Sequence, residues 1–277
     1  MKSYDVVIIG GGIAGLTASI YLAKAGLSVS LLEKANQFGG RALTVKKGGA
    51  SLNLGAHALY RGGAVETVLR ELGVEPKGAY PPVRAGAVWN NRVYPLPANP
   101  LALMTSRLFS WPEKMEFVRF MLKLNQTDPA RIGQISLKEW AEREIQHPMV
   151  RHVIYSVSRT NTYVPHPELH LAAPAVRRMQ QTLAGKAFYL DGGWGALVED
   201  LRERAGRSGV ALFQQKRAVE VEHDGRVRRI RCADGETIES SYVVIAAGPK
   251  EARELVQNAD RTSLAKWEAA ARPVRAA

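Results

Sequence analysis

The chain has 277 residues, 46% of them hydrophobic and 23% charged, which predicts about two folded domains and excludes a disordered or fibrous protein. The net charge of +12 is compatible with an anionic ligand or simply with a solvated basic surface, and because no nucleic-acid-binding motif is present, we expect no nucleic-acid partner. The single cysteine, Cys232, fits no zinc-binding spacing, so we expect a cytoplasmic protein without a metal site.

The N-terminal part predicts a βαβ unit. The β-branched run Tyr4–Ile9 does not alternate with polar residues, which is typical of a parallel strand buried on both faces. Ile13–Ala25 predicts a helix that ends at a glycine, and Leu27–Glu33 predicts a second strand. The stretch 6–23 lacks charges, but three consecutive glycines interrupt it, so neither export nor membrane insertion is expected. We therefore expect an α/β fold with a Rossmann-like parallel sheet.

A glycine motif, Gly10-x-Gly12-x-x-Gly15, joins the first strand to the helix. Its first glycine permits a tight turn, the second lets the backbone approach a pyrophosphate, and the third lets helix and strand pack closely. Glu33 ends the second strand, where its carboxylate can bind the hydroxyls of an adenosine ribose and disfavours NADP. The motif does not distinguish FAD from NAD, and the structural alternative is a tight turn without a ligand. The candidate cofactor-binding residues here are Gly10, Gly12, Ile13, Ala14, Gly15, Glu33 and Lys34.

Residues 78–184 predict an inserted, mostly helical domain between two parts of a dinucleotide-binding domain, 1–77 and 185–277. Val83–Tyr94 predicts a hairpin with Asn90-Asn91 at its turn. Helical segments are expected at 111–124, 136–144, 149–158 and 168–183. The first helix has an apolar face that fits either a lipid-like or polycyclic substrate or an ordinary core. This face consists of Trp111, Phe117, Phe120, Met121 and Leu124.

The last part of the chain predicts a return to the first domain. An amphipathic helix is expected at 195–207, strands of a β-meander and a parallel strand follow, and another helix begins at Lys250. The expected strands are 210–213, 218–222, 227–232 and 242–246. The arginines of the third strand favour a charged edge strand, with a lipid or partner contact as the alternative. These arginines are Arg226, Arg228, Arg229 and Arg231. His166 and His170 lie four residues apart, but no third ligand is evident, so zinc is not expected.

Two further motifs follow the acid at position 33. They are Phe38-Gly39-Gly40-Arg41-Ala42, followed by Thr44, and Asn53-x-Gly55-Ala56-His57. An arginine on a glycine-flexible loop can bind phosphate bidentately, whereas a lysine acts as a point charge. With these motifs the chain resembles the flavin-dependent amine oxidase superfamily, in particular its phytoene desaturase-like and protoporphyrinogen oxidase-like members. Three later segments extend the resemblance, namely Leu190–Gly195, Ala218–Val221 and Val243–Pro249.

The resemblance implies that FAD is the cofactor. It implies that Gly40 and Arg41 lie against the pyrophosphate, and that Gly55 and His57 lie near the isoalloxazine ring, although a structural role is the alternative for the histidine. It further implies contacts of Val219 with the adenine and of Ala247 near the pyrophosphate. No residue is assigned as catalytic.

The activity implied by the resemblance is that of an FAD-dependent oxidoreductase, which transfers hydride from a substrate C–H bond to the flavin. We expect a small-molecule substrate, with an apolar one and peripheral membrane contact as options. Members of the family usually continue well past the segment that ends here at Gly248, so we expect a truncated chain or an N-terminal fragment. The alternatives are a non-catalytic dinucleotide-binding module and an NAD-dependent dehydrogenase.

Overall fold

The computed structural model describes residues 2–81, 86–97, 99–184 and 187–267. The described residues divide into two compact units, and each unit is treated by itself. The first unit contains residues 2–59, 64–79 and 188–267, and the second contains residues 60–63 and the described part of 80–187. The end of the chain, 269–277, lies outside the described residues.

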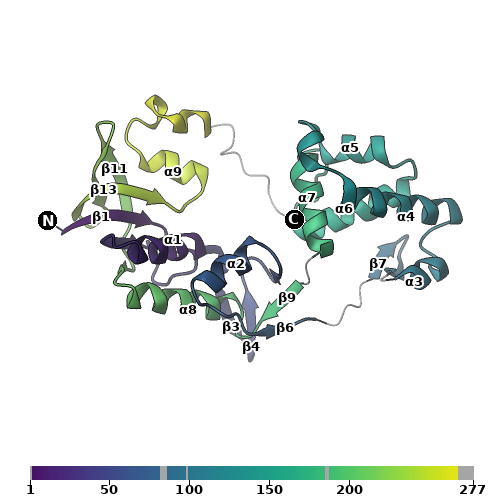
Figure 1. Ribbon diagram of the computed structural model, residues 1–277, viewed down its shortest axis with the longest axis horizontal. Helices are drawn as coiled ribbons and strands as arrows, with labels where there is room; N and C mark the ends of the chain where they lie inside the picture. Colours follow the sequence, from purple (N-terminus) through teal and green to yellow (C-terminus); the bar gives the residue numbers. More distant parts are fainter. Residues whose placement is uncertain (1, 82–85, 98, 185–186, 268–277) are drawn as a thin grey trace. The chain divides into compact units, whose positions relative to one another are not determined.

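A mixed six-stranded sheet is the main sheet of the first unit (Figure 1). Its strands are β1 (Lys2–Ile9), β2 (Val29–Leu32), β10 (Ala211–Phe213), β11 (Ala218–His223), β12 (Val227–Cys232) and β13 (Thr237–Ile245). The strand order is β10-β2-β1-β13-β12-β11. Pairing is parallel from β10 to β13 and antiparallel from β13 to β11. This topology confirms the predicted α/β fold with a parallel sheet and a β-meander.

The central parallel strands are buried on both faces. Helices α1 (Ile13–Lys24) and α8 (Trp194–Arg207) lie side by side and contribute to the hydrophobic cluster on one face (Figure 1). Val6 belongs to this cluster, whereas its neighbour Val7 belongs to a second cluster. Successive side chains of a strand point to opposite faces, so burial of both faces explains why this strand shows no polar alternation.

Two features of the sheet correct the predictions. Strand β12 lies between β11 and β13 and is not an edge strand, so the edge interpretation of its arginines is wrong. The arginines concerned are Arg226, Arg228, Arg229 and Arg231. Cross-strand ion pairs explain two of these arginines on an inner strand, because Arg229 pairs with Glu222 and Arg231 with Glu220 on β11. The strand expected at 242–246 is the end of the longer β13, which pairs with β12 only at its first three residues and with β1 along nearly its whole length.

The first unit also contains smaller elements. They are β3 (Thr44–Lys47), β4 (Ala50–Asn53), β5 (Leu59–Tyr60), β6 (Gly78–Ala79), β9 (Ala187–Leu190), α2 (Ala64–Glu71), α9 (Pro249–Leu255) and the 3-10 turns η1 (Gly40–Ala42), η3 (Ala259–Arg261) and η4 (Ser263–Trp267). Strands β3 and β4 form a hairpin, and β5, β9 and β6 form a three-stranded sheet in that order. The chain passes between the two units within β5, just before α2, just after β6 and within β9.

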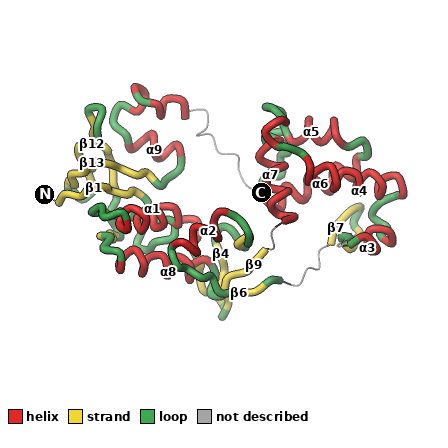
Figure 2. The backbone as a smooth tube through the Cα atoms, in the orientation of Figure 1, coloured by secondary structure: helices red, strands yellow, loops and turns green. Residues whose placement is uncertain are grey.

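The second unit is mostly helical (Figure 2). Its elements are the hairpin β7 (Gly86–Trp89) and β8 (Arg92–Pro95), the helices α3 (Pro100–Thr105), α4 (Trp111–Gln126), α5 (Leu137–Glu144), α6 (Pro148–Thr162) and α7 (Ala172–Ala184), and the 3-10 turn η2 (Pro129–Arg131). Asn90 and Asn91 have φ angles of 47° and 59°, as a tight hairpin turn requires. Serine–glutamate capping boxes at Ser110 and Ser136 fix where α4 and α5 begin.

Three details of the second unit differ from the sequence prediction or refine it. Helix α3 is not among the predicted elements, and α7 begins at Ala172 rather than 168, so His166 and His170 lie in the turn before it. Most of the predicted apolar face of α4 belongs to the core, as the ordinary-core alternative requires, but Trp111 is 58% exposed. The core residues on this face are Phe117, Phe120, Met121 and Leu124.

Candidate dinucleotide-binding site

Two positions in the turn between β1 and α1 must be glycine, because a side chain there would collide with neighbouring backbone atoms of the protein. Gly10 has a φ of 111°, and a Cβ atom there would lie 2.6 Å from the carbonyl oxygen of Ala246. A Cβ atom on Gly15 would lie 1.9 Å from the carbonyl oxygen of Gly10. Both distances are far shorter than a van der Waals contact. The end of β1, the start of α1 and the end of β13 can therefore pack together only if these two positions have no side chain.

Gly12 differs, because nothing in the described protein requires a glycine there. Its φ of −75° suits any residue, and the nearest atom to a Cβ at this position would be the oxygen of Gly39, 3.8 Å away. Gly12 is the N-cap of α1, yet no side chain caps this helix, and its first turn has no acidic residue. In the described part of the chain, no group accepts a hydrogen bond from the N–H of Ile13, Ala14 or Gly15. A helix start of this kind fits a phosphate group.

The carboxylate of Glu33 is held at the glycine turn. Glu33 is 7% exposed; its Oε2 accepts a hydrogen bond from the N–H of Gly11 at 2.7 Å, and its Oε1 accepts one from Ala35 at 2.8 Å. A carboxylate has about four acceptor positions, so both oxygens retain one for a further donor such as a ribose hydroxyl. Gly11 is also restricted by the protein, because a Cβ there would lie 2.4 Å from the ring of Phe38.

The arginine-containing loop lies directly against the glycine turn. The N–H of Gly39 donates to the oxygen of Gly11 at 2.8 Å, and Gly39 also forms an isolated bridge with Gly12. Arg41 follows in η1, is exposed and forms no ion pair with the described residues. A Cβ on Gly55 would lie 2.0 Å from the oxygen of Arg41, which places the second motif beside the first. The structure therefore brings three separate glycine-containing segments together at the start of α1.

The start of α8 is joined to the hairpin β3–β4 by two polar side chains that sequence reasoning left without a role. Asn53 Oδ1 accepts hydrogen bonds from the N–H of Trp194 at 3.0 Å and from the hydroxyl of Thr44 at 2.8 Å. Thr44 Oγ1 accepts the N–H of Gly195 at 2.8 Å. Both side chains lie within the motifs that carried the family resemblance, but their partners are more than a hundred residues away, which no local pattern reveals.

The remaining predicted residues lie around this centre. Lys34, His57, Val219 and Ala247 are all exposed. Val219 is in β11, shortly after Lys216, whose N–H donates to the oxygen of Glu33 at 2.8 Å. Ala247 directly follows Ala246, whose N–H donates to the oxygen of Ile9 at 2.8 Å.

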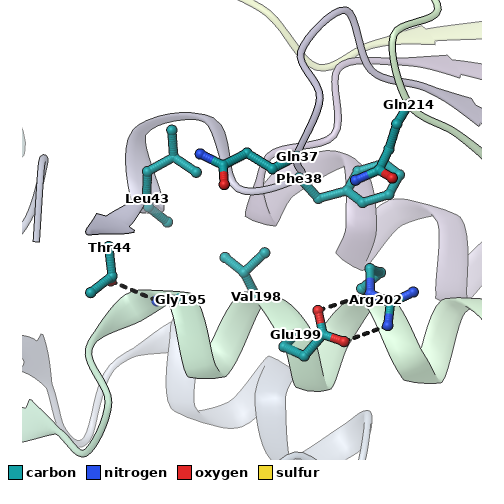
Figure 3. A pocket seen from close by; sticks show the side chains of 10 residues that line it. Gln37, Phe38, Leu43, Thr44, Gly195, Val198, Glu199, Arg202 and Gln214 are labelled. Carbon is teal, nitrogen blue, oxygen red and sulfur yellow. Dashed lines mark hydrogen bonds and ion pairs between the residues drawn. The ribbon is translucent and has the colours of Figure 1, made fainter. Parts of the chain in front are cut away.

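A cavity of about 280 Å³ lies between the segment 37–44 and α8 (Figure 3). Phe38, Thr44 and Val198 line it, together with an ion pair in which Arg202 Nε donates to Glu199 Oε2 at 2.8 Å. This hydrogen bond lowers the pKa of the glutamate and raises that of the arginine. Because the arginine already has a carboxylate partner, the cavity is a poor phosphate site, and the start of α1 is the better candidate.

Two other kinds of site were predicted to be absent. Among residues 2–81, 86–97, 99–184 and 187–267, no three histidine, cysteine or acidic residues are grouped as metal ligands. Within the same ranges, no helix combines the length and the apolar composition that crossing a membrane requires.

Comparison with known proteins gives a consistent result. Residues 13–274 match the model of a family described as flavin containing amine oxidoreductase. The 15-cis-phytoene desaturase of Arabidopsis thaliana is 27% identical over 281 residues, which cover 89% of this chain and 48% of that protein. The chain thus spans about half the length of the curated relatives it matches.

Two solved structures show the same fold. An oxidoreductase from Methanosarcina mazei superposes with a TM-score of 0.74 at 17% identity, covering 97% of this chain and 63% of the other. A putrescine oxidase bound to putrescine superposes with a TM-score of 0.72 at 20% identity, covering 91% of this chain and 60% of the other.

Proposed function

The chain belongs to the flavin containing amine oxidoreductase family, and from this premise we propose that it binds FAD in the first unit as part of an FAD-dependent oxidoreductase. The observation that carries the proposal is the uncapped start of α1, with the Glu33 carboxylate and the arginine loop fixed beside it. A helix start that has no acceptor among the described residues, next to a carboxylate and an exposed arginine, matches the phosphate and ribose chemistry of a dinucleotide.

Each group near α1 has a defined task in this proposal. The N–H groups of the first turn, at Ile13 and Ala14, hold the pyrophosphate, and the guanidinium of Arg41 contacts the same phosphates. Glu33 accepts hydrogen bonds from the ribose hydroxyls. When bound, the flavin supplies the acceptor for a hydride from a substrate C–H bond.

The other predicted residues complete the proposed site. Lys34 and Val219 border the adenosine, and the backbone of Ala247 lies near the pyrophosphate. Gly40 and Gly55 let the arginine loop and the following segment approach the cofactor, and His57 lies on the side of the isoalloxazine ring. The support for Gly40 and Gly55 is their packing against Gly12 and Arg41, respectively.

The second unit is proposed to supply the substrate site. This corresponds to the inserted domain expected at 78–184, and an apolar small molecule is the proposed substrate class. The support is the resemblance to 15-cis-phytoene desaturase. A cytoplasmic location stays a prediction, and peripheral membrane contact depends on the surface of the second unit rather than on the cofactor site.

FAD binding by this chain is tested with the purified protein. We expect a flavin absorption spectrum, either as purified or after titration with FAD, and no comparable binding of NAD. Arg41→Ala removes a charge-assisted contact and is expected to weaken FAD binding by about tenfold or more. Arg70→Ala, at an exposed site in α2, is the matched control and should leave the affinity unchanged.

Three results would contradict parts of the proposal. Equal FAD affinity of the Arg41→Ala variant and the parent removes the phosphate role of Arg41. Preferential binding of NAD favours the dehydrogenase alternative. Bound flavin that cannot be photoreduced anaerobically and reoxidised by oxygen favours a non-catalytic binding module.

A further inference from the structure

Helix α4 has two apolar faces, and only one of them is covered. The buried face carries Phe120 and Leu124, which are 4% and 2% exposed in the core of the second unit. On the opposite face, apolar residues recur at a spacing of four, three and four positions, which is one continuous stripe on a helix. We call Trp111, Met115, Val118 and Leu122 the α4 stripe; they are 58%, 58%, 42% and 64% exposed.

Helix α3 extends this apolar surface. Leu101 and Met104 are 75% and 50% exposed, while Leu103 between them is buried. Lys114 Nζ donates to the carbonyl oxygen of Met104 at 2.7 Å and lies 5.2 Å from the centre of the Trp111 ring. These contacts join the end of α3 to the first turn of α4, so exposed apolar residues of both helices lie near this junction. Several large apolar side chains exposed together on a folded protein indicate an interaction site.

The charges around the α4 stripe are basic. Arg107 and Arg119 are exposed on or next to α4, and Lys123 is exposed but pairs with Glu144 of α5. Both acids of the helix have hydrogen-bond partners: Glu113 caps the helix through Ser110, and Glu116 accepts the N–H groups of Gln146 and His147. The helix therefore presents apolar side chains to solvent beside exposed cations and engaged carboxylates.

We propose that this surface of α3 and α4 lies on a bilayer that contains anionic lipids. The α4 stripe would enter the boundary between headgroups and acyl chains, and the basic residues would contact lipid phosphates. Tryptophan and long basic side chains favour this boundary because each combines an apolar part with a polar end. The inference goes beyond the proposed function and does not depend on FAD.

A second copy of the chain fits this surface less well. Packing one α4 stripe against another would bring Arg119 of both copies to the rim of the same contact. Like charges at close range oppose association, whereas anionic headgroups attract every one of these cations. Charge complementarity therefore favours the lipid surface.

Vesicle flotation with this chain tests the proposal. We expect binding to vesicles of phosphatidylcholine mixed with phosphatidylglycerol, weaker binding to phosphatidylcholine alone, and weaker binding to the mixed vesicles as salt is added. Leu122→Glu places a charge in the apolar stripe and is expected to weaken vesicle binding by about tenfold or more. Leu169→Glu is the matched control, because Leu169 is 59% exposed in the turn before α7 and should bind like the parent.

A second pair of variants separates the charge contribution. Arg119→Glu is expected to reduce the preference for anionic vesicles by about tenfold, whereas Arg217→Glu in the first unit should leave it unchanged. Circular dichroism of each variant shows whether it folds like the parent. Because these side chains are exposed, folding should be preserved.

The proposal is overturned if the parent floats with neither kind of vesicle, or if Leu122→Glu and Leu169→Glu behave alike. A different result would assign the surface to a second copy: the parent elutes as a dimer and does not bind vesicles, and the Leu122→Glu variant elutes as a monomer. Since the readout is vesicle binding, these outcomes leave the FAD proposal unaffected.

Discussion

Replacement of Gly12 by alanine is expected to separate cofactor binding from folding. The φ of −75° suits alanine, and the new methyl group would meet no atom of the described protein closer than 3.8 Å. Loss of backbone freedom in the unfolded chain stabilises such a variant by about 0.4–1 kcal/mol. Alanine is a poorer N-cap than glycine by a similar amount, so the two effects nearly cancel. The free energy of unfolding should therefore change by about 0.5 kcal/mol or less.

FAD affinity of the same variant should fall strongly. The methyl group would occupy the space through which the pyrophosphate approaches the N–H groups of α1. A hydrogen bond to a charged group contributes about 1.5–3 kcal/mol, so the loss of one corresponds to about 10-fold to 150-fold weaker binding. Titration with FAD gives the affinity, and urea unfolding monitored by circular dichroism gives the stability.

Two other glycines provide the comparison. Gly15→Ala would place a methyl group 1.9 Å from the oxygen of Gly10 and should destabilise the unit by about 1–3 kcal/mol or more. Gly206→Ala in α8, where no atom lies within 4 Å, should retain both folding and FAD affinity. If Gly12→Ala binds FAD as tightly as the parent, the phosphate does not lie at the start of α1, and the reasoning fails.

Two further predictions concern stability. Burial alone would raise the pKa of Glu116, but the hydrogen bonds from the N–H groups of Gln146 and His147 and from the His147 ring lower it below its ordinary 4.5. The ionised Glu116 thus stabilises the fold above pH 4.5, and this stabilisation is lost as the pH falls through the pKa of the folded state. Glu116→Gln should therefore lower the free energy of unfolding by about 1–2 kcal/mol at neutral pH and by less in acid. Chemical unfolding at several pH values checks this, and a constant difference would contradict it. Thr44→Val removes the acceptor of the Gly195 N–H and should lower the free energy of unfolding by about 1–2 kcal/mol. The control Thr127→Val, at the exposed end of α4, should lower it by less than about 0.5 kcal/mol. Equal costs in urea unfolding would refute a capping role for Thr44.

The first βαβ unit was predictable because its determinants are local. The run Tyr4–Ile9, the glycine spacing and the apolar helix each report on their own conformation, and the structure has β1 and α1 within two residues of the expected limits. Helix α8 was predictable for the same reason, since the residues of its expected apolar face are buried. These residues are Leu197, Val198, Leu201 and Ala205.

Long-range pairing was less accessible from the sequence. The arginines of β12 are compatible with an edge strand or with cross-strand ion pairs, and only the neighbours of the strand decide between them. The two apolar faces of α4 raise a related difficulty. Periodicity identifies both faces, but the core of the second unit determines which one is covered.

The candidate site was predictable as a set of motifs but not as an assembly. Spacing alone indicated Gly12 and Glu33, whereas the contact of Gly39 with the glycine turn needs the fold. The direction of the Glu33 carboxylate is likewise set by Gly11 and Ala35, two backbone donors that have no distinctive side chains.

The two side-by-side helices of the first unit differ in one respect that affects ligand selectivity. Thr44 and Asn53 already occupy the leading amides of α8, so its positive end is neutralised internally and does not compete for an incoming anion. Helix α1 has no such internal occupant. Of these two helices, α1 is therefore the one whose first amides are open to a diphosphate among the described residues, so an anion that reaches the pair binds at α1 rather than at α8.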